Sequence, residues 1–337
     1  MNRTRLHQLG IDLPLLPTTS VGSLPKPPDL VAARARFARS GMSQRELDES
    51  TEEAVLFWLQ RQEELGLDVL VDGEMYRGDM VAYFADQLDG MELGGLVRAY
   101  GNRYYHKPVI RGPVRWEQPM TVGWWRFAQG HAKKPVKAII TGPYTLMDWS
   151  FNEHYPDRRG ACLALAHEMR KEVEALAAAG AKIVQIDEPA LSVRPDELPM
   201  AIEATRIVTE GVPVYSITHA CYGAFEHIYP GMLGLPTHNL DLAISQSAID
   251  WIGIMQCAPF TKDLSVGVLD VHTYAVESVQ AVSGCIERAL QLVPREALWV
   301  TPDCGLKTRT VEEAIEKLGT MVAATQLVRE STAGRQS

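Results

Sequence analysis

The sequence predicts a (β/α)8 barrel. Short runs of β-branched and other apolar residues alternate along the chain with longer amphipathic stretches, the pattern of repeated strand–helix units. Eight such runs are present, and polar residues fall at their carboxyl ends, where barrels of this class carry their active sites. The alternative, an open doubly wound sheet, is disfavoured because no GxGxxG or GxxxxGK motif marks a nucleotide crevice.

The eight strands and the helices between them are predicted in chain order. Strands are expected at 17–23, 68–74, 135–141, 182–188, 213–219, 240–246, 265–272 and 297–303. Helices are expected where apolar residues recur at helical spacing, at 43–65, 159–179, 195–209, 276–292 and 310–329. Residues 1–337 are therefore predicted to form a single catalytic domain.

One segment, 75–134, departs from this alternation. It contains three tryptophans and is too long to be a bare loop between the second and third strands. We predict an excursion with strands of its own over the barrel mouth. In that position it would act as a lid.

Composition limits the classes of function. The net charge is −9 and no basic residues are concentrated, which argues against a nucleic-acid partner. Five scattered cysteines do not form a disulfide framework, and the chain has no apolar signal segment at its start and no window apolar enough to span a membrane. We therefore expect a cytoplasmic protein with reduced thiols and a small-molecule or protein partner.

A zinc site is predicted from two strand ends. The run that begins at Val214 ends in His219 and Cys221, a spacing that places both side chains on the same side of an extended segment. Cys304 follows a second strand-like run and can supply another thiolate. Three such ligands suit zinc and leave one tetrahedral position open for chemistry. The alternative is a hydrogen-bonded histidine with two small core cysteines.

Acidic residues end two further predicted strands. Glu74 and Asp187 are candidates to bind a substrate ammonium group or to carry protons. Their neighbours Asp72 and Glu188 are expected to cap helices or to form ion pairs at the barrel rim.

Two other strand ends carry polar candidates. Ser23 offers a hydroxyl group beside a glycine, which suits a substrate carboxylate, although a plain turn fits nearly as well. His272 closes the predicted strand 265–272 and can donate or accept a proton near neutral pH.

Six runs, in order from about Thr18 to the C-terminus, resemble the catalytic half of cobalamin-independent methionine synthase. They are TTSVGSLP at 18–25, LGLDVLVDGEMYRGDM at 65–80, TGPYTLMDWSF at 141–151, IDEPAL at 186–191, HACY at 219–222 and WVTPDCGLKTR at 299–309. The last of these runs is highly specific. In that family a (β/α)8 barrel holds a zinc ion that binds the thiol of homocysteine, and a methyl group is transferred to this thiol to form methionine.

The resemblance implies a role for each candidate. The implied zinc ligands are His219, Cys221 and Cys304. The implied substrate-binding residues are Ser23, Glu74 and Asp187 for homocysteine and Trp149 for stacking on folate. Arg103, in the excursion, is a further predicted substrate-binding residue. The implied proton carrier is His272. Asp187 is a second candidate, because a folate amine must be protonated as it leaves.

Departures from the family bear on the metal and on the methyl donor. The family's second, N-terminal barrel, which helps to hold the folate polyglutamate tail, has no counterpart here, so a core-only enzyme is expected. The family's fourth zinc ligand corresponds to Ala243, so either water, Cys257 or another carboxylate completes the zinc sphere, or zinc rests with three protein ligands and the substrate sulfur becomes the fourth. A pterin-binding glutamate is replaced by Val193. We therefore expect methylcobalamin or a methylated corrinoid protein to be a better methyl donor than methyltetrahydrofolate. Methyltetrahydrofolate is not excluded as a donor, because Trp149 is retained.

Two other functions stay open on the sequence alone. One is a related zinc-dependent alkyltransferase that acts on another thiol, although the retained Glu74 and Asp187 argue against it. The other is a non-catalytic barrel that binds a corrinoid or a partner methyltransferase, and its only support is the alanine at position 243.

Overall fold

Within the part of the chain that the structure describes, six strands form one sheet in the order in which they occur along the chain. They are Ala138–Thr141 (β3), Ile183–Asp187 (β5), Tyr215–Ala220 (β6), Asn239–Leu242 (β7), Asp263–Gly267 (β8) and Leu298–Thr301 (β9). The pairs β3–β5, β5–β6 and β8–β9 are parallel, and every residue of the six strands is buried. Burial on both faces explains the near-continuous apolar runs in the sequence. This alternation of parallel strands and helices is the predicted (β/α)8 class.

The computed structural model describes residues 3–98, 104–221, 225–245, 251–256 and 258–333. The chain divides into two compact units. The first contains Met1–Tyr76, Trp124–Lys137 and Asp241–Ser337, and the second contains Arg77–Gly123 and Ala138–Leu240. Among the described residues, no helix combines the length and the apolar character that a membrane span needs.

The first two predicted strands are reduced to single bridges in the first unit. Thr18 pairs in parallel with Val300 of β9, and Thr19 pairs in parallel with Val69. Leu70 in turn pairs with Val136, two residues before β3 begins. The strand-like segments at 17–23 and 68–74 are thus in the expected neighbourhood, but only two residues of each take part in pairing.

Several predicted strands end earlier than expected, and the correction matters for the site. The segment 265–272 is extended only as far as Gly267, because loop side chains accept the backbone N–H groups of Asp270 and His272. The segment 68–74 gives way to a turn at 73–76, where the N–H of Glu74 donates to the carboxylate of Asp72. The predicted strand 240–246 also ends early, at Leu242, and its last position, 246, lies outside the described residues.

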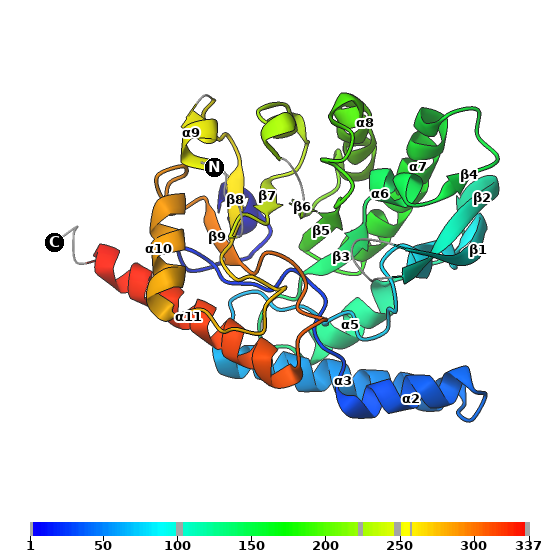
Figure 1. Cartoon of the computed structure of the whole chain (residues 1–337), viewed down its shortest axis with the longest axis horizontal. Helices are drawn as coiled ribbons and strands as arrows, with labels where there is room; N and C mark the ends of the chain where they lie inside the picture. Colours follow the sequence, from blue (N-terminus) through cyan, green and yellow to red (C-terminus); the bar gives the residue numbers. More distant parts are fainter. Residues whose placement is uncertain (1–2, 99–103, 222–224, 246–250, 257, 334–337) are drawn as a thin grey trace. The chain divides into compact units, whose positions relative to one another are not determined.

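The five predicted helices are present with small shifts. Ser43 caps α3 (Gln44–Leu65) in a capping box with Glu46, and Asp157 caps α7 (Arg158–Ala178). The others are α8 (Leu198–Thr209), α10 (Val279–Ala289) and α11 (Val311–Ala333). The helices that the sequence did not indicate are short or begin at proline: α1 (Arg3–Gln8), α2 (Pro28–Ala38), α4 (Ala82–Ala85), α5 (Val122–His131), α6 (Pro143–Asp148) and α9 (Trp251–Gln256). In the first unit, α10 and α11 pack against each other, and α11 also contacts β9 (Figure 1).

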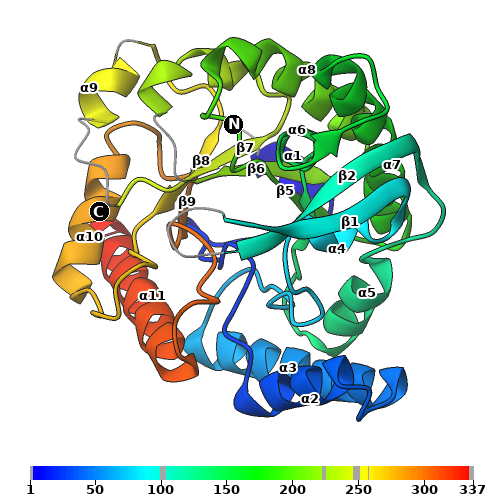
Figure 2. The ribbon, with the colours of Figure 1, turned by 45° about the vertical axis from the view of Figure 1, so that its right-hand side comes forward.

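The excursion has its own strands, as predicted. In the second unit, β1 (Leu88–Arg98) and β2 (Tyr104–Trp116) form an antiparallel hairpin, and β4 (Phe151–Asn152) adds to β2 in parallel. Figure 2 brings this twisted hairpin to the front. The hairpin is anchored to α7 by the fully buried Glu172, which accepts hydrogen bonds from Trp116, Met120 and Thr121. Its placement over a barrel mouth stays a prediction.

Candidate active site and metal centre

Three neighbouring strands of the second unit bring polar side chains to one edge. In the parallel register, Thr141 at the end of β3 lies opposite Asp187 at the end of β5, which lies opposite His219 in β6. Residues that pair in register point to the same face of a sheet, so these three side chains form a row. All three are buried. A hydroxyl, a carboxylate and an imidazole group thus lie in sequence along the carboxyl edge.

The imidazole of His219 and the thiol of Cys221 lie on the same segment. His219 is 2% exposed and Cys221 is 4% exposed, so both lie inside the protein. Because β6 ends at Ala220, Cys221 is the first residue beyond the strand. One imidazole nitrogen and one thiol on the same segment could supply two ligands to a metal ion such as zinc.

Gln185 orients the carboxylate of Asp187. Its side-chain amide donates to Oδ1 of Asp187 over 2.6 Å, and it is fully buried on the same strand. Gln185 was not predicted from the sequence. Its position two residues before Asp187 was a usable signal, because residues two apart on a strand point to the same face.

Glu188 turns to the start of α6, in keeping with its expected capping role. Its carboxylate accepts hydrogen bonds from the N–H groups of Tyr144 and Thr145, and from the hydroxyl of Thr145 over 2.6 Å. Burial raises the pKa of Glu188 to about 7, because desolvation of the charge outweighs these hydrogen bonds and the nearby Asp187 acts in the same direction. Glu188 therefore fastens the end of β5 to the helix that precedes Trp149.

Trp149 follows α6 directly and is half-buried. Its ring lies 5.8 Å from the ring of Tyr105 in β2, at an angle of 47°. The Tyr105 hydroxyl also donates to the Trp149 carbonyl over 3.4 Å. The hairpin therefore supports one side of this indole ring. Arg103, the other predicted substrate contact in the excursion, lies outside the described residues.

In the first unit, Ser23 lies against the segment that carries Cys304. The N–H of Leu306 donates to the Ser23 carbonyl over 2.7 Å. Gly305 approaches so closely that an added Cβ would lie 2.0 Å from the Ser23 hydroxyl oxygen. The N–H of Leu24 donates to the carbonyl of Gly73, which brings the turn containing Glu74 to the same place. Ser23, Glu74 and Cys304 thus meet, although the three lie far apart in the sequence.

Glu74 has a left-handed backbone, with φ of 56°, and its side chain is 8% exposed. This conformation is rare for residues other than glycine and costs about 1–3 kcal/mol. The turn is held by the Glu74 N–H, which donates to Asp72 Oδ1 over 2.8 Å, and by Lys26, which donates to the Glu74 carbonyl over 3.3 Å. Strain of this kind concentrates at functional positions.

Asp303, beside the half-buried Cys304, is itself buried. It accepts hydrogen bonds from the Ser245 backbone N–H, over 3.0 Å, and from the Ser245 hydroxyl. Burial raises the pKa of Asp303 to about 6 despite these bonds, and Asp270 adds to the rise. Ser245, which sequence reasoning did not single out, ties the segment after β7 to the segment after β9. Cys257 lies outside the described residues.

His272 lies on an exposed part of the loop that follows β8, five positions beyond the strand. Its backbone N–H donates to Asp270 Oδ1 over 2.8 Å. The prediction that it closes a strand is wrong, because the loop uses its own carboxylates as acceptors in place of a neighbouring strand. Its side chain is accessible to a substrate that enters from solvent.

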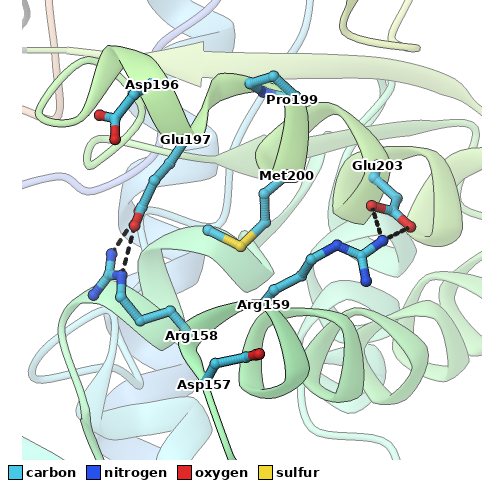
Figure 3. A pocket seen from close by; sticks show the side chains of 8 residues that line it. All are labelled: Asp157, Arg158, Arg159, Asp196, Glu197, Pro199, Met200 and Glu203. Atoms are coloured by element: carbon cyan, nitrogen blue, oxygen red, sulfur yellow. Dashed lines mark hydrogen bonds and ion pairs between the residues drawn. The ribbon is translucent and has the colours of Figure 1, made fainter.

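A surface groove of about 640 Å³ in the second unit contains none of the predicted site residues. It is lined by residues at the starts of α7 and α8, and Figure 3 shows that its two arginines each pair with a glutamate, whereas Asp157 and Asp196 pair with none of the other residues drawn. Arg158 bonds to Glu197, and Arg159 bonds to Glu203. Both arginines of the groove are thus engaged by carboxylates and are not available to bind an anionic substrate.

Comparison with known proteins gives one consistent result. Residues 16–327 match the family described as "Cobalamin-independent synthase, Catalytic domain". A methionine synthase of Saccharolobus solfataricus is 36% identical over 319 residues, which cover 94% of this chain and 96% of that protein. A 5-methyltetrahydropteroyltriglutamate–homocysteine methyltransferase of Corynebacterium glutamicum is 36% identical over 340 residues, which cover 97% of this chain and 46% of that protein.

A solved structure has the same fold. A B12-independent methionine synthase from Shewanella sp. W3-18-1, in complex with selenomethionine, is 26% identical and superposes with a TM-score of 0.86. The match covers 95% of this chain and 100% of that one. The chain nevertheless spans less than half the length of several curated relatives that it matches.

Proposed function

Because the chain belongs to the family of cobalamin-independent methionine synthase catalytic domains, we propose that it is a methyltransferase that transfers a methyl group to the thiol of homocysteine and forms methionine. The observation that carries this proposal is the match to the family's catalytic domain across residues 16–327. A relative of nearly equal length, the Saccharolobus protein, carries the name methionine synthase.

We propose that His219, Cys221 and Cys304 bind one zinc ion. The donor set supports this, because the ligand atoms of the three side chains lie within 4.8 Å of one another. One imidazole nitrogen and two sulfurs suit zinc better than magnesium or calcium, which prefer oxygen ligands. When bound, zinc would hold the homocysteine thiol in its thiolate form, which is the nucleophile.

The remaining residues of the site bind and orient homocysteine in this proposal. The carboxylates of Glu74 and Asp187 face its ammonium group, and the Ser23 hydroxyl donates to its carboxylate. The burial of both carboxylates supports this, because a charge-assisted pair is stronger where water is excluded. Gln185 keeps the Asp187 carboxylate in a fixed orientation.

For the methyl donor we propose a methyltetrahydropteroyl compound. The Corynebacterium relative is named for 5-methyltetrahydropteroyltriglutamate, and the matched family is named cobalamin-independent. The expectation of methylcobalamin or a methylated corrinoid protein finds no support in these relatives. Trp149, supported by Tyr105, offers the aromatic face on which a pterin ring can stack.

Donor chemistry gives His272 a task. When a methyl group leaves a pterin nitrogen, that nitrogen must gain a proton, so an acid within reach accelerates the step. We assign this proton to the imidazole of His272, with the Asp187 carboxyl as the alternative carrier. The exposed position of His272 supports exchange of its proton with water after each turnover.

The deciding experiment supplies purified, zinc-loaded protein with homocysteine and one methyl donor at a time, with oxygen excluded. The donors are the mono- and triglutamate forms of methyltetrahydrofolate, and methylcobalamin. Methionine formation with the folates alone supports the proposal. Turnover with methylcobalamin alone would overturn the donor assignment, and the absence of methionine with every donor would overturn the function itself.

A further inference from the structure

Lys317, in the middle of α11, is a fully buried cation with a specific set of acceptors. Its side chain is 0% exposed. The ammonium group donates to the Ala275 carbonyl over 2.5 Å and to Glu277 Oε2 over 2.9 Å. Both acceptors belong to the loop between β8 and α10, within the first unit. A buried cation is costly unless it is paired in this way, so the helix and the loop are bound to each other.

A continuous path of hydrogen bonds leads from this ion pair to His272. The second carboxylate oxygen of Glu277 accepts the backbone N–H of Asp270 over 2.8 Å. The carboxylate of Asp270 accepts the backbone N–H of His272 over 2.8 Å. Lys317 is therefore linked to the proposed proton carrier through Glu277 and Asp270. Glu277 takes part with its two carboxylate oxygens, and Asp270 takes part with its backbone N–H and its carboxylate.

The same loop is also fixed at its beginning. The N–H of Val268 donates to the Thr301 carbonyl, and the Leu269 carbonyl accepts the N–H of Asp303 over 3.0 Å. Leu269 is 0% exposed. His272 is thus presented at the exposed crest of a loop whose two sides are both held.

We propose that Glu277 and Lys317 are positioning residues that set the orientation of the loop 268–277 and so hold His272 where it can deliver its proton. This inference rests on the proposed function, because it assigns the pair a role in the same reaction. An ion pair with a purely structural role would affect stability alone. A positioning pair affects the turnover number, because an acid displaced by about 1 Å loses much of its catalytic effect.

The chain offers a matched control on the same helix. Further along α11, Arg329 donates to Asp68 over 2.6 Å and also to the carbonyls of Leu15 and Leu16. This ion pair is likewise largely buried, with side chains 23% and 12% exposed, and it does not contact the loop of His272. Asp68→Asn therefore removes a comparable interaction without disturbing the proposed path.

The test compares four proteins: wild type, Glu277→Leu, Glu277→Gln and Asp68→Asn. We expect Glu277→Leu to lower kcat by at least ~10-fold and to change the KM for homocysteine by less than ~2-fold, since the path to the acid is cut while the thiol site is intact. Glu277→Gln keeps an acceptor oxygen for the Asp270 N–H but removes the anion that pairs with Lys317, so its kcat should lie between those of the wild type and Glu277→Leu. Asp68→Asn should lower the melting temperature and leave kcat unchanged. Lys317→Met, which removes the cation instead, serves if Glu277→Leu does not fold.

Hydrogen exchange of the amides of 268–277, followed by mass spectrometry, is the readout that does not depend on turnover. Faster exchange there in Glu277→Leu, with no change in Asp68→Asn, supports the proposal. Unchanged exchange, or a kcat that falls equally in Glu277→Leu and Asp68→Asn, would overturn it. If wild-type protein makes no methionine with any donor, the proposed function is wrong, and exchange alone decides whether the pair orders this loop.

Discussion

Asp187 lies directly opposite His219 across the parallel pairing of β5 and β6, and both side chains are buried. This pairing places an anionic group beside a candidate metal ligand. The hydrogen bond from Gln185 leaves the carboxylate little freedom to rotate. A change at Asp187 is therefore expected to act on the neighbouring ligand as well as on the substrate.

We first predict the metal content. Purified protein should contain about one zinc ion per chain, and Cys221→Ser or Cys304→Ser should lose both zinc and methionine formation while keeping the far-ultraviolet circular dichroism of the wild type. Elemental analysis provides the measurement. Cys285→Ser is the control, because Cys285 is a half-buried residue of α10 and should not affect the metal. Full turnover after removal of zinc by a chelator would contradict this assignment.

The backbone at Glu74 separates stability from activity. We expect the free energy of unfolding to be about 1 kcal/mol higher for Glu74→Gly than for Glu74→Ala. Glycine adopts φ of 56° without strain, whereas alanine is strained in that conformation. Both variants lack the carboxylate and should bind homocysteine more weakly by roughly 1.5–3 kcal/mol. Denaturant unfolding and isothermal titration provide the two measurements. Equal stability of the two variants would show that this turn stores no strain.

Glu188 makes stability depend on pH. Its folded-state pKa of about 7 exceeds the ordinary value of 4.5, so its contribution to stability is full below pH 4.5 and is lost as the pH rises through 7. Relative to Glu188→Gln, the wild type should lose about 2–3 kcal/mol of unfolding free energy between pH 5 and pH 8. Urea unfolding of both proteins at the two pH values tests this. Glu49→Gln, at an exposed carboxylate, should show no such difference.

A single methyl group at Gly305 should disturb Ser23. Because the added Cβ of Gly305→Ala would lie 2.0 Å from the Ser23 hydroxyl oxygen, Ser23 must move, and we expect the KM for homocysteine to rise roughly tenfold through loss of one hydrogen bond. Steady-state kinetics with varied homocysteine measures this change. Gly130→Ala is the control, since that glycine lies in α5 with open space around it. An unchanged KM in Gly305→Ala would show that the serine hydroxyl does not contact the substrate.

The fold class could be predicted from the sequence, and so could the ends of those strands that are buried and regularly paired. His219 and Asp187 were placed at the ends of β6 and β5 because continuous apolar runs mark strands that are buried on both faces. The family resemblance, carried by specific runs such as PDCGLKTR, agrees with the match across residues 16–327.

The sequence failed where side chains compete with backbone pairing. The apolar runs that end at Val71 and Val271 suggested strands up to Glu74 and His272, but Asp72, Asp270 and Glu277 accept backbone N–H groups and convert the expected strand ends into loops. Such local bonds depend on three-dimensional positions that periodicity does not encode. The link between Lys317 and Glu277 was missed for the same reason, because forty residues separate the partners.

The carboxylate of Glu172 accepts four hydrogen bonds from the stretch between Trp116 and Thr121, and it comes from the middle of α7. A chain trimmed of residues 88–121 would leave this buried carboxyl group without these four donors, which costs several kcal/mol. Conversely, a hairpin that is grafted onto another barrel would lack Glu172, the acceptor for Trp116 at the end of β2. The excursion and α7 therefore depend on each other. A variant in which the hairpin is shortened, grafted or replaced also needs a matching change in α7.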